Sequence, residues 1–300
     1  MVEKPHVMNE TNQLTVIVPA FNEAKNLTLF LPPLISFCRE NNWRIILVND
    51  GSTDSTVQFL KEYLEEPALT VLHHKLNKGY GAAIKTGILA CETEYLITFD
   101  ADGQHYLEDI GKLLAFLKKH DADMVVGSRK GLKSSSYYRG IGKRIIRMLA
   151  RIMMTVPVHD INSGMKVYRT DLAKNYLYLT PDTMSFSDVI TLIFINQRHL
   201  VLEEPIGIKD RTNGESTIGI QTAFQTVMEI LNIVILFNPM KIFLPLSILC
   251  LFVSLVWGIP LVWEGRGVSI GSLLGIVSTL IFFLLGLITE QLSQIRRNQK

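Results

Sequence analysis

A chain of 300 residues has room for one large or two small domains, and its nearly half hydrophobic content and positive mean hydropathy are high for a wholly soluble protein. The net charge of +2 is close to balance, which gives no indication of a nucleic-acid partner. Three widely spaced cysteines exclude a disulfide framework and a zinc site, and they indicate a reducing compartment.

The amino-terminal two thirds of the chain alternate between predicted strands and helices. Residues 1–13 are polar and lack an apolar core, so no secretory signal is predicted there. The first helix is expected from Asn22 or Glu23 to about residue 41, with an interruption at Pro32-Pro33. Alternating strands and helices predict an α/β fold with a mostly parallel sheet and right-handed crossovers. The four short β-prone runs that lead to this prediction are residues 14–19, 44–49, 69–73 and 95–99.

The fourth run ends in a pair of carboxylates, Asp100 and Asp102. Positions i and i+2 of an extended chain point to the same side, and ligands of open α/β sheets bind beyond the carboxyl ends of the strands. Two convergent carboxylates with oxygen-only ligation suit Mg²⁺ or Mn²⁺. The alternative is an ordinary Asp-Gly turn. An EF-hand is excluded because Gln104 and His105 stand where its loop needs Asp or Asn and then Gly.

Other nucleotide-binding motifs are absent from the sequence. After Gly79 and Gly81, Ile84 occupies the third position that a dinucleotide fingerprint reserves for a small residue. No Gly-Lys-Ser or Gly-Lys-Thr phosphate loop occurs either. The sequence therefore favours neither a dehydrogenase nor a P-loop protein.

Seven short segments, in order along residues 14–218, resemble the motifs of the family 2 glycosyltransferases, and the later ones resemble the dolichol-phosphate mannose synthase branch. They are Val18-Pro-Ala-Phe-Asn-Glu23, Val48-Asn-Asp-Gly-Ser-Thr-Asp54, Asn77-Lys-Gly79, Phe99-Asp-Ala-Asp-Gly-Gln-His105, Val126-Gly-Ser-Arg129, Ser163-Gly-Met-Lys-Val-Tyr-Arg169 and Arg211-Thr-Asn-Gly-Glu-Ser216. The resemblance implies the GT-A fold and metal-dependent transfer of one sugar, with inversion, from a nucleotide donor to a polyprenyl phosphate such as dolichyl or undecaprenyl phosphate.

The same resemblance assigns the donor site. Asp100, Asp102 and Gln104 would hold Mg²⁺ or Mn²⁺ beside the donor diphosphate. Where the family usually has two acids before Gly-Ser, the first is Asn49 here, so the choice of base stays open. The positions carried over as contacts of the nucleotide sugar are Pro19, Ala20, Glu23, Asp50, Lys78 and Ala101.

A phosphate acceptor changes what the acceptor site needs. A phosphate monoester has a second pKa of about 6, so it is already a nucleophile at neutral pH and needs cations to position it. Asp188, which lies where many family 2 enzymes place a base or an acid near the acceptor, would then orient the acceptor or serve as a base. Thr217 stands where the branch often has Lys. The residues expected to bind the acceptor phosphate are Arg129, Lys143, Arg211 and Ser216.

The last third of the chain changes composition. Residues 219–240 predict an amphipathic helix at a membrane interface, or alternatively a core helix of the soluble domain. Residues 242–263 and 268–289 contain no charged residue and are each long enough to span a bilayer, so a hairpin within residues 241–290 is predicted. Lys241 and the basic tail of residues 291–300 flank it, which predicts an integral membrane protein with the catalytic domain of residues 14–218 and both termini in the cytoplasm.

Two rival functions remain at this point. A processive polysaccharide synthase of the same superfamily typically carries Gln-X-X-Arg-Trp, which none of the three tryptophans completes. A non-catalytic membrane scaffold that binds nucleotide or lipid would not need the Asp100 and Asp102 pair. The sequence leaves open the sugar, the base and the oligomeric state, a homo-oligomer included.

Overall fold

The computed structural model describes residues 13–129, 157–209, 235 and 238–298. The chain divides into two compact units. The sheet unit comprises residues 1–133 and 156–216, and the hairpin unit comprises residues 134–155 and 217–300. Most of the predicted interfacial helix, residues 219–234, lies outside the described residues.

Within the described residues, seven strands form one mixed, mostly parallel sheet in the order β3-β2-β1-β4-β6-β5-β7. Strand β6 runs antiparallel between β4 and β5, and the other described pairings are parallel. This confirms the predicted α/β class with a mostly parallel sheet. The strands are β1 (Leu14–Ala20), β2 (Arg44–Asn49), β3 (Leu69–His73), β4 (Tyr95–Thr98), β5 (Met124–Ser128), β6 (Lys166–Arg169) and β7 (Val201–Pro205).

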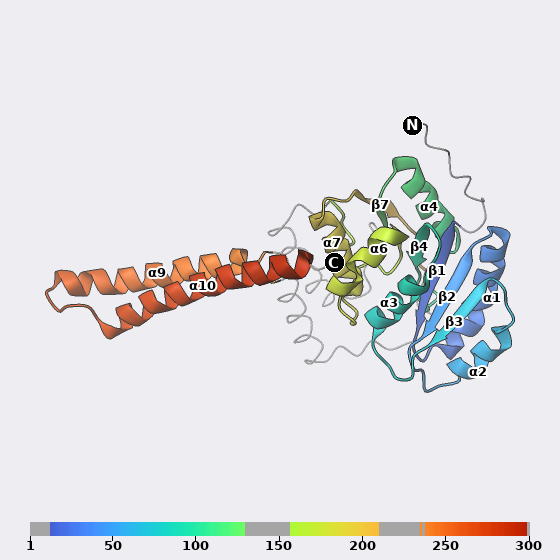
Figure 1. The fold of residues 1–300 in the computed structure, drawn as a ribbon, viewed down its shortest axis with the longest axis horizontal. Coiled ribbons are helices and arrows are strands. Elements are labelled where there is room, and N and C mark those ends of the chain that lie inside the picture. Colours follow the sequence, from blue (N-terminus) through green and yellow to red (C-terminus); the bar gives the residue numbers. More distant parts are fainter. Residues whose placement is uncertain (1–12, 130–156, 210–234, 236–237, 299–300) are drawn as a thin grey trace. The chain divides into compact units, whose positions relative to one another are not determined.

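Helices cover both faces of this sheet, with α1 and α2 on one side and α3, α6 and α7 on the other (Figure 1). The reason is the alternation of side chains along buried strands. Val16 and Val18 of β1 belong to the core that includes α1, whereas Ile17 points to α3, where a Cβ on Gly87 would lie 2.5 Å from Ile17 Cγ2. The helices are α1 (Ala24–Glu40), α2 (Thr56–Leu60), α3 (Tyr80–Ala90), α4 (Glu108–His120), α6 (Thr170–Tyr176) and α7 (Phe186–Asn196), with short 3₁₀ turns at Lys61–Tyr63 and Leu177–Leu179.

Helix α1 differs from the sequence-based expectation because it is not interrupted at Pro32-Pro33. Two prolines remove two backbone donors, which disfavours a helix interior. Here buried side chains on both sides of the pair, including Leu27, Leu31 and Leu34, pack into the sheet-unit core. Burial of that apolar face outweighs the lost hydrogen bonds, since most helical stability in proteins comes from tertiary packing.

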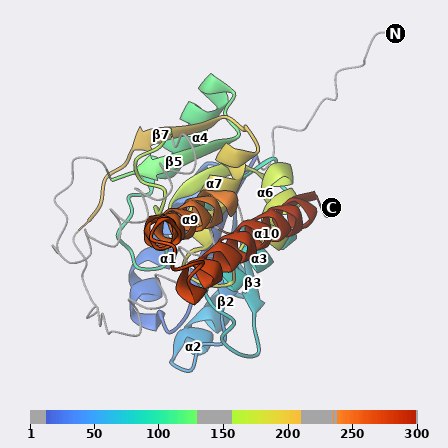
Figure 2. The same ribbon diagram turned by 90° about the vertical axis from the view of Figure 1, so that its left-hand side faces the viewer.

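The hairpin unit contains two helices, α9 (Met240–Trp263) and α10 (Ile270–Asn298), which lie side by side (Figure 1, Figure 2). Among the described residues these are the helices long and apolar enough to cross a membrane, with mean hydropathies of 2.5 and 2.4. Only 17% and 11% of their most apolar windows are buried, whereas a core helix of a soluble domain is mostly buried. Helix α10 also continues through residues 291–298, which the sequence assigned to a basic tail.

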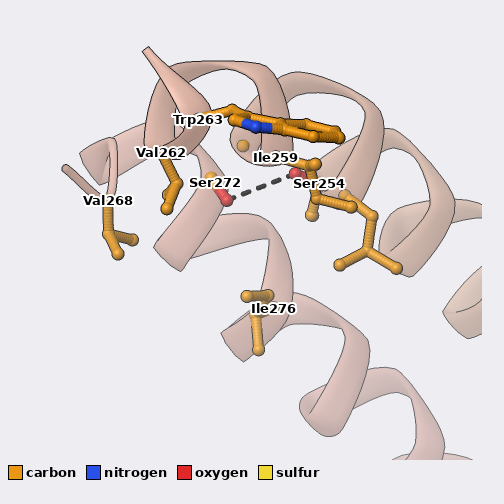
Figure 3. Close-up of a pocket in the computed structure, with 9 residues that line it drawn as sticks. Ser254, Ile259, Val262, Trp263, Val268, Ser272 and Ile276 are labelled. Atoms are coloured by element: carbon orange, nitrogen blue, oxygen red, sulfur yellow. Dashed lines mark hydrogen bonds between the residues drawn. The ribbon is translucent and has the colours of Figure 1, made fainter. Parts of the chain in front are cut away.

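Small residues let the two hairpin helices approach closely. The Ser272 hydroxyl donates to the backbone oxygen of Ser254 at 3.2 Å (Figure 3). A Cβ on Gly258 would lie 2.9 Å from the Cβ of Ser272, and one on Gly275 would lie 3.0 Å from the Cβ of Ser254. Such contacts are typical of helix pairs in membranes. Toward the turn at residues 264–267, a cavity of about 520 Å³ opens between the helices, lined by Ser254, Leu255, Gly258, Ile259, Val262, Trp263, Val268, Ser272 and Ile276 (Figure 3).

Candidate active site

Asp100 lies just beyond β4, at the carboxyl edge of the sheet, as the sequence predicts. Its Oδ1 accepts a hydrogen bond of 2.7 Å from the hydroxyl of Tyr80, the first residue of α3. Its Oδ2 lies 3.8 Å from His105 Nε2. Gly164 lies on another side of the Asp100 carboxylate, and a Cβ at this position would lie only 2.6 Å from Asp100 Cγ. The carboxylate therefore sits in a space that a tyrosine, a histidine and a glycine define.

This environment keeps Asp100 ionised. Burial by itself would raise the pKa of the carboxyl group, but the neighbouring His105, the Tyr80 hydroxyl and the charge of Arg129 together hold that pKa below its usual value. Burial and the nearby Asp100 raise the pKa of Tyr80 well above its usual value, so the phenol stays protonated and acts as the donor. An ionised carboxylate at neutral pH is the form that binds a cation.

Asp102 lies in the turn that follows. Its Oδ1 accepts the backbone N–H of Gln104 at 3.1 Å, and Gly103 between them has a φ of 71°. The backbone oxygen of Gln104 in turn accepts the N–H of Lys209 at 2.8 Å. These bonds tie the acidic turn to the segment after β7.

The donor set suits a hard divalent cation. Asp100, Asp102 and Gln104 offer oxygen atoms, which Mg²⁺ and Mn²⁺ prefer. The Nδ1 atom of the buried His105 has no hydrogen-bond partner within the described part of the chain. In that same part, however, no group of three or more His, Cys, Asp or Glu side chains gathers into a ready-made metal site.

Asp50, at the end of β2, is buried and uses both carboxylate oxygens within the protein. Oδ1 accepts His74 Nδ1–H at 2.6 Å and the Lys78 N–H at 2.9 Å, and Oδ2 accepts the Gly79 N–H at 2.8 Å. The other nitrogen of His74 lies 2.8 Å from the hydroxyl oxygen of Thr86. Asp50 therefore fixes the loop before α3, a role that the sequence-based prediction of a base or ribose contact did not include.

The other residues predicted to bind the nucleotide also border this edge. Pro19 and Ala20 are the buried last residues of β1, and Ala101 is buried between the two site carboxylates. The Glu23 N–H donates to Thr56 Oγ1 at 3.1 Å, which joins the loop after β1 to the start of α2. Lys78 is exposed.

Arg129, the residue after β5, forms a fork-to-fork pair with Asp160. Its Nε and Nη2 donate to the two carboxylate oxygens at 2.6 and 2.7 Å, and Nη2 also donates to Asn162 Oδ1 at 3.1 Å. The hydrogen bond to Asp160 is the main cause that raises the pKa of Arg129 above its usual value. The guanidinium, predicted to bind the acceptor phosphate, is thus held by an acidic partner that the sequence analysis did not identify.

Lys166, in β6, is a fully buried cation that the sequence analysis missed. Its ammonium donates to the backbone oxygen of Ile161 at 2.7 Å and to that of Ser187 in the first turn of α7. Burial lowers the pKa of Lys166 to about 7, against the opposing effect of Asp188 and Asp160. In the sequence, the position of Lys166 between the apolar Met165 and Val167 was the signal that could have indicated its burial. Asp188 is almost fully buried in the same first turn of α7.

Three predicted acceptor residues, Lys143, Arg211 and Ser216, lie outside the described residues. The structure thus brings Asp100, Asp102 and Gln104 together at one edge and places Arg129 and Asp188 among the charged neighbours of Lys166.

Comparisons with known proteins agree with this geometry. A family model described as glycosyl transferase family 2 matches residues 15–177, and one described as GtrB C-terminal hairpin matches residues 238–295. Among solved structures, the glucosyl-3-phosphoglycerate synthase of Mycobacterium tuberculosis in complex with Mn²⁺, uridine diphosphate and glucosyl-3-phosphoglycerate has a TM-score of 0.56 at 15% identity, over 74% of this chain and 79% of that one. This likeness confirms the expected GT-A fold.

Curated relatives were found over most of the chain. The dodecaprenyl-phosphate galacturonate synthase of Rhizobium johnstonii is 26% identical, over 74% of this chain and 66% of its own length. The polyprenol monophosphomannose synthase of Mycolicibacterium smegmatis is 29% identical, over 71% of this chain and 84% of its own length. The dolichyl-phosphate beta-glucosyltransferase of Dictyostelium discoideum is 31% identical, over 54% and 55%. The chain therefore spans between about half and five sixths of these relatives.

Proposed function

This chain belongs to the family 2 glycosyltransferases, and from that membership we propose that it transfers a single sugar from a nucleotide-sugar donor to a polyprenyl phosphate at a membrane. The observation that carries the proposal is the presence, in one chain, of a family 2 domain with an acidic pair at its sheet edge and a hairpin of membrane-spanning length. The relatives named above all carry a polyprenyl or dolichyl phosphate product or acceptor in their names, which supports the same acceptor class here.

The donor is expected to lie across the carboxyl ends of β1, β2 and β4. Asp100, Asp102 and Gln104 would hold Mg²⁺ or Mn²⁺, which when bound offsets the charge that develops on the departing nucleoside diphosphate. A neighbour of the same fold crystallised with Mn²⁺ and uridine diphosphate supports this choice of ion. Pro19, Ala20, Glu23, Asp50, Lys78 and Ala101 are the proposed contacts of the nucleotide sugar.

The acceptor phosphate supplies its own nucleophilic oxygen, so the protein's task is to position it. Arg129, Arg211 and Lys143 are proposed to face that phosphate, with Ser216 as a hydrogen-bond donor. Because Asp160 holds two donor groups of Arg129, the remaining nitrogen, Nη1, is the one we assign to the acceptor. Attack opposite the departing diphosphate inverts the anomeric carbon, and Asp188 would orient the acceptor.

We further propose that the sheet unit faces the cytoplasm, where nucleotide sugars are made. Lys241 precedes α9, and Arg296 and Arg297 lie near the end of α10, so both outer ends of the hairpin carry positive residues. Positive residues at helix ends favour the cytoplasmic side. The turn at residues 264–267 would then lie on the opposite side of the membrane.

The test is a panel of radiolabelled sugar nucleotides added to membranes that contain the protein, together with a short polyprenyl phosphate. A lipid-linked monosaccharide supports the proposal. A polymeric product would instead indicate a processive polysaccharide synthase, and no turnover with any donor would indicate a non-catalytic scaffold.

The same assay tests the proposed metal ligands with a variant of Asp102. Asp102→Ala is expected to abolish turnover because it removes one of two anionic ligands, while thermal unfolding shows that the protein remains folded. Activity retained in the folded variant would contradict the assignment of Asp102.

A further inference from the structure

We propose that Tyr80 is a positioning residue that holds the Asp100 carboxylate in its cation-binding orientation. The inference rests on the proposed function, because it takes Asp100 to be a metal ligand. It adds a residue of α3, a helix that supplies no proposed metal ligand.

The contact between Tyr80 and Asp100 is short and directional. The Tyr80 hydroxyl donates to Oδ1 at 2.7 Å, the distance of a strong hydrogen bond to a charged acceptor. Gly164 closes another side of the carboxylate, and His105 lies beyond Oδ2. A carboxylate can turn about its Cβ–Cγ bond, and a bond to one oxygen is what prevents that rotation. Tyr80 is the group placed to fix it.

Tyr80 can hold the carboxylate in place because hydrogen bonds fix the backbone on both sides of it. Before it, the N–H groups of Lys78 and Gly79 are bound by Asp50. After it, the N–H groups of Gly81 and Ala82 donate to the backbone oxygen of Asp182 at 2.9 and 3.3 Å.

The glycines on either side of Tyr80 allow this close approach. A Cβ on Gly81 would lie 2.8 Å from the carbonyl carbon of Asp182, and Gly79 has a φ of 103°. The Lys85 ammonium also bonds to Asp182 Oδ1 at 2.8 Å, which holds the same loop against α3. The first turn of α3 therefore has little freedom to move the phenol.

Outer partners of metal ligands typically contribute 10- to 100-fold to metal affinity. Tyr80→Phe removes the hydroxyl and keeps the ring, so we expect Mn²⁺ to bind about 10- to 100-fold more weakly to this variant. Gly81→Ala should also weaken Mn²⁺ binding, because its Cβ would lie 2.8 Å from the carbonyl carbon of Asp182 and would displace the first turn of α3, which carries Tyr80. Binding is measured on the full chain in detergent by electron paramagnetic resonance of free Mn²⁺, in the presence of uridine diphosphate and, separately, guanosine diphosphate.

Tyr176→Phe is the matched control. Its hydroxyl also makes a partly buried hydrogen bond, at 2.8 Å to His199 Nε2, and this bond involves none of the proposed metal ligands. A general loss of stability would act on both tyrosine variants, whereas only Tyr80→Phe is expected to change Mn²⁺ affinity. Thermal unfolding of each variant without Mn²⁺ gives the stability comparison.

The outcomes separate this inference from the proposed function. If the wild-type protein binds Mn²⁺ and folded Tyr80→Phe binds it equally well, the positioning role is wrong and the metal site stands. If Tyr80→Phe does not fold, an unchanged Mn²⁺ affinity in folded Gly81→Ala overturns the positioning role. If the wild-type protein binds no Mn²⁺ with either nucleotide, the metal assignment and this inference both fail, whatever sugar transfer is observed.

Discussion

Single residues at the carboxyl edge of the sheet are placed by contacts between distant parts of the chain. Asp100 contacts Tyr80, His105 and Gly164, and only His105 is near it in sequence. The antiparallel pairing of Thr98 with Lys166 explains why Gly164 lies beside Asp100. Continuing that register two residues further brings residue 164 opposite residue 100. The Thr98 hydroxyl also donates to the Gly164 backbone oxygen at 2.5 Å, which fixes the glycine there.

This geometry makes Gly164→Ala a sensitive change. A Cβ at this position would lie 2.6 Å from Asp100 Cγ, so the carboxylate would have to move. Because displacements of about 1 Å in an active site can cost about 100-fold in rate, we expect kcat/KM for sugar transfer to fall by about that factor. The measurement is steady-state transfer at saturating Mn²⁺.

Gly111→Ala is the control for that variant. Gly111 lies in α4, and its new Cβ would be 3.6 Å from a Trp43 carbon, an ordinary contact. Replacing glycine in a helix interior stabilises it by up to about 1 kcal/mol, so activity should be unchanged and the unfolding temperature slightly higher. Equal activity in both variants would contradict the close approach at Gly164.

At the scale of elements, two polar links, one partly buried and one fully buried, join neighbouring segments of the sheet unit. The Arg129 and Asp160 pair connects the end of β5 to the loop before β6. The Lys166 ammonium connects β6 to the first turn of α7 through Ser187 and to the loop through Ile161. Both links carry charge into a part of the protein where an unpaired charge is costly.

The pKa of Lys166 leads to a prediction for stability. Burial lowers this pKa to about 7 in the folded protein, below its ordinary value of 10.5. The Lys166 side chain is then charged in both the folded and the unfolded protein below about pH 7, and it is neutral in both well above pH 10.5. Between these limits the unfolded chain binds more protons, so the free energy of unfolding rises with pH.

We therefore expect wild-type protein to gain stability relative to Lys166→Met as the pH is raised from about 7 to about 10. One unit of pKa shift corresponds to about 1.4 kcal/mol, and a gain larger than that is expected over this interval. Unfolding of both proteins at several pH values measures the difference, in which all other titrating groups cancel. A difference that does not change with pH would show that Lys166 keeps an ordinary pKa.

The hairpin is an element whose packing depends on small residues, as the close approach of Gly275 to Ser254 illustrates. Gly275→Leu places a large side chain where even a Cβ would lie 3.0 Å from the Cβ of Ser254. Overpacking of this kind typically costs 1 to 3 kcal/mol, so we expect a loss of about 2 kcal/mol in detergent unfolding. Gly271→Leu is the control, because the nearest atom to its Cβ is 3.8 Å away. Equal stability of the two variants would contradict the packing between α9 and α10.

At the scale of the whole molecule, the two units provide different functions that the proposed reaction needs together. The sheet unit carries the site carboxylates and Arg129, and the hairpin unit carries the two helices that are long and apolar enough to cross a membrane. A lipid phosphate presents its charged group at a membrane surface, so an enzyme acting on it benefits from an anchor in that membrane.

The proposed orientation can be tested with introduced cysteines at the two ends of α9. A membrane-impermeant maleimide should label Lys241→Cys from the cytoplasmic side and Arg266→Cys only from the opposite side, because α9 is proposed to cross the bilayer. Vesicles of both orientations supply the comparison. The unsubstituted protein is the baseline, since Cys38 and Cys91 are buried and Cys250 lies within α9. Labelling of both positions from the same side would contradict a spanning α9.

The first four strands, the acidic pair after β4, the family and the apolar hairpin were all determined by the sequence alone, because each depends on a local pattern of hydrophobic and turn residues or on motifs of a few residues. The unbroken helix through Pro32-Pro33, the burial of Lys166 and the partners of Asp50, Arg129 and Asp100 were decided by the tertiary structure. The physical reason is that these features depend on which distant segments become neighbours. The insertion of β6 antiparallel between β4 and β5 sets those neighbours, and no local pattern in the sequence specifies that insertion.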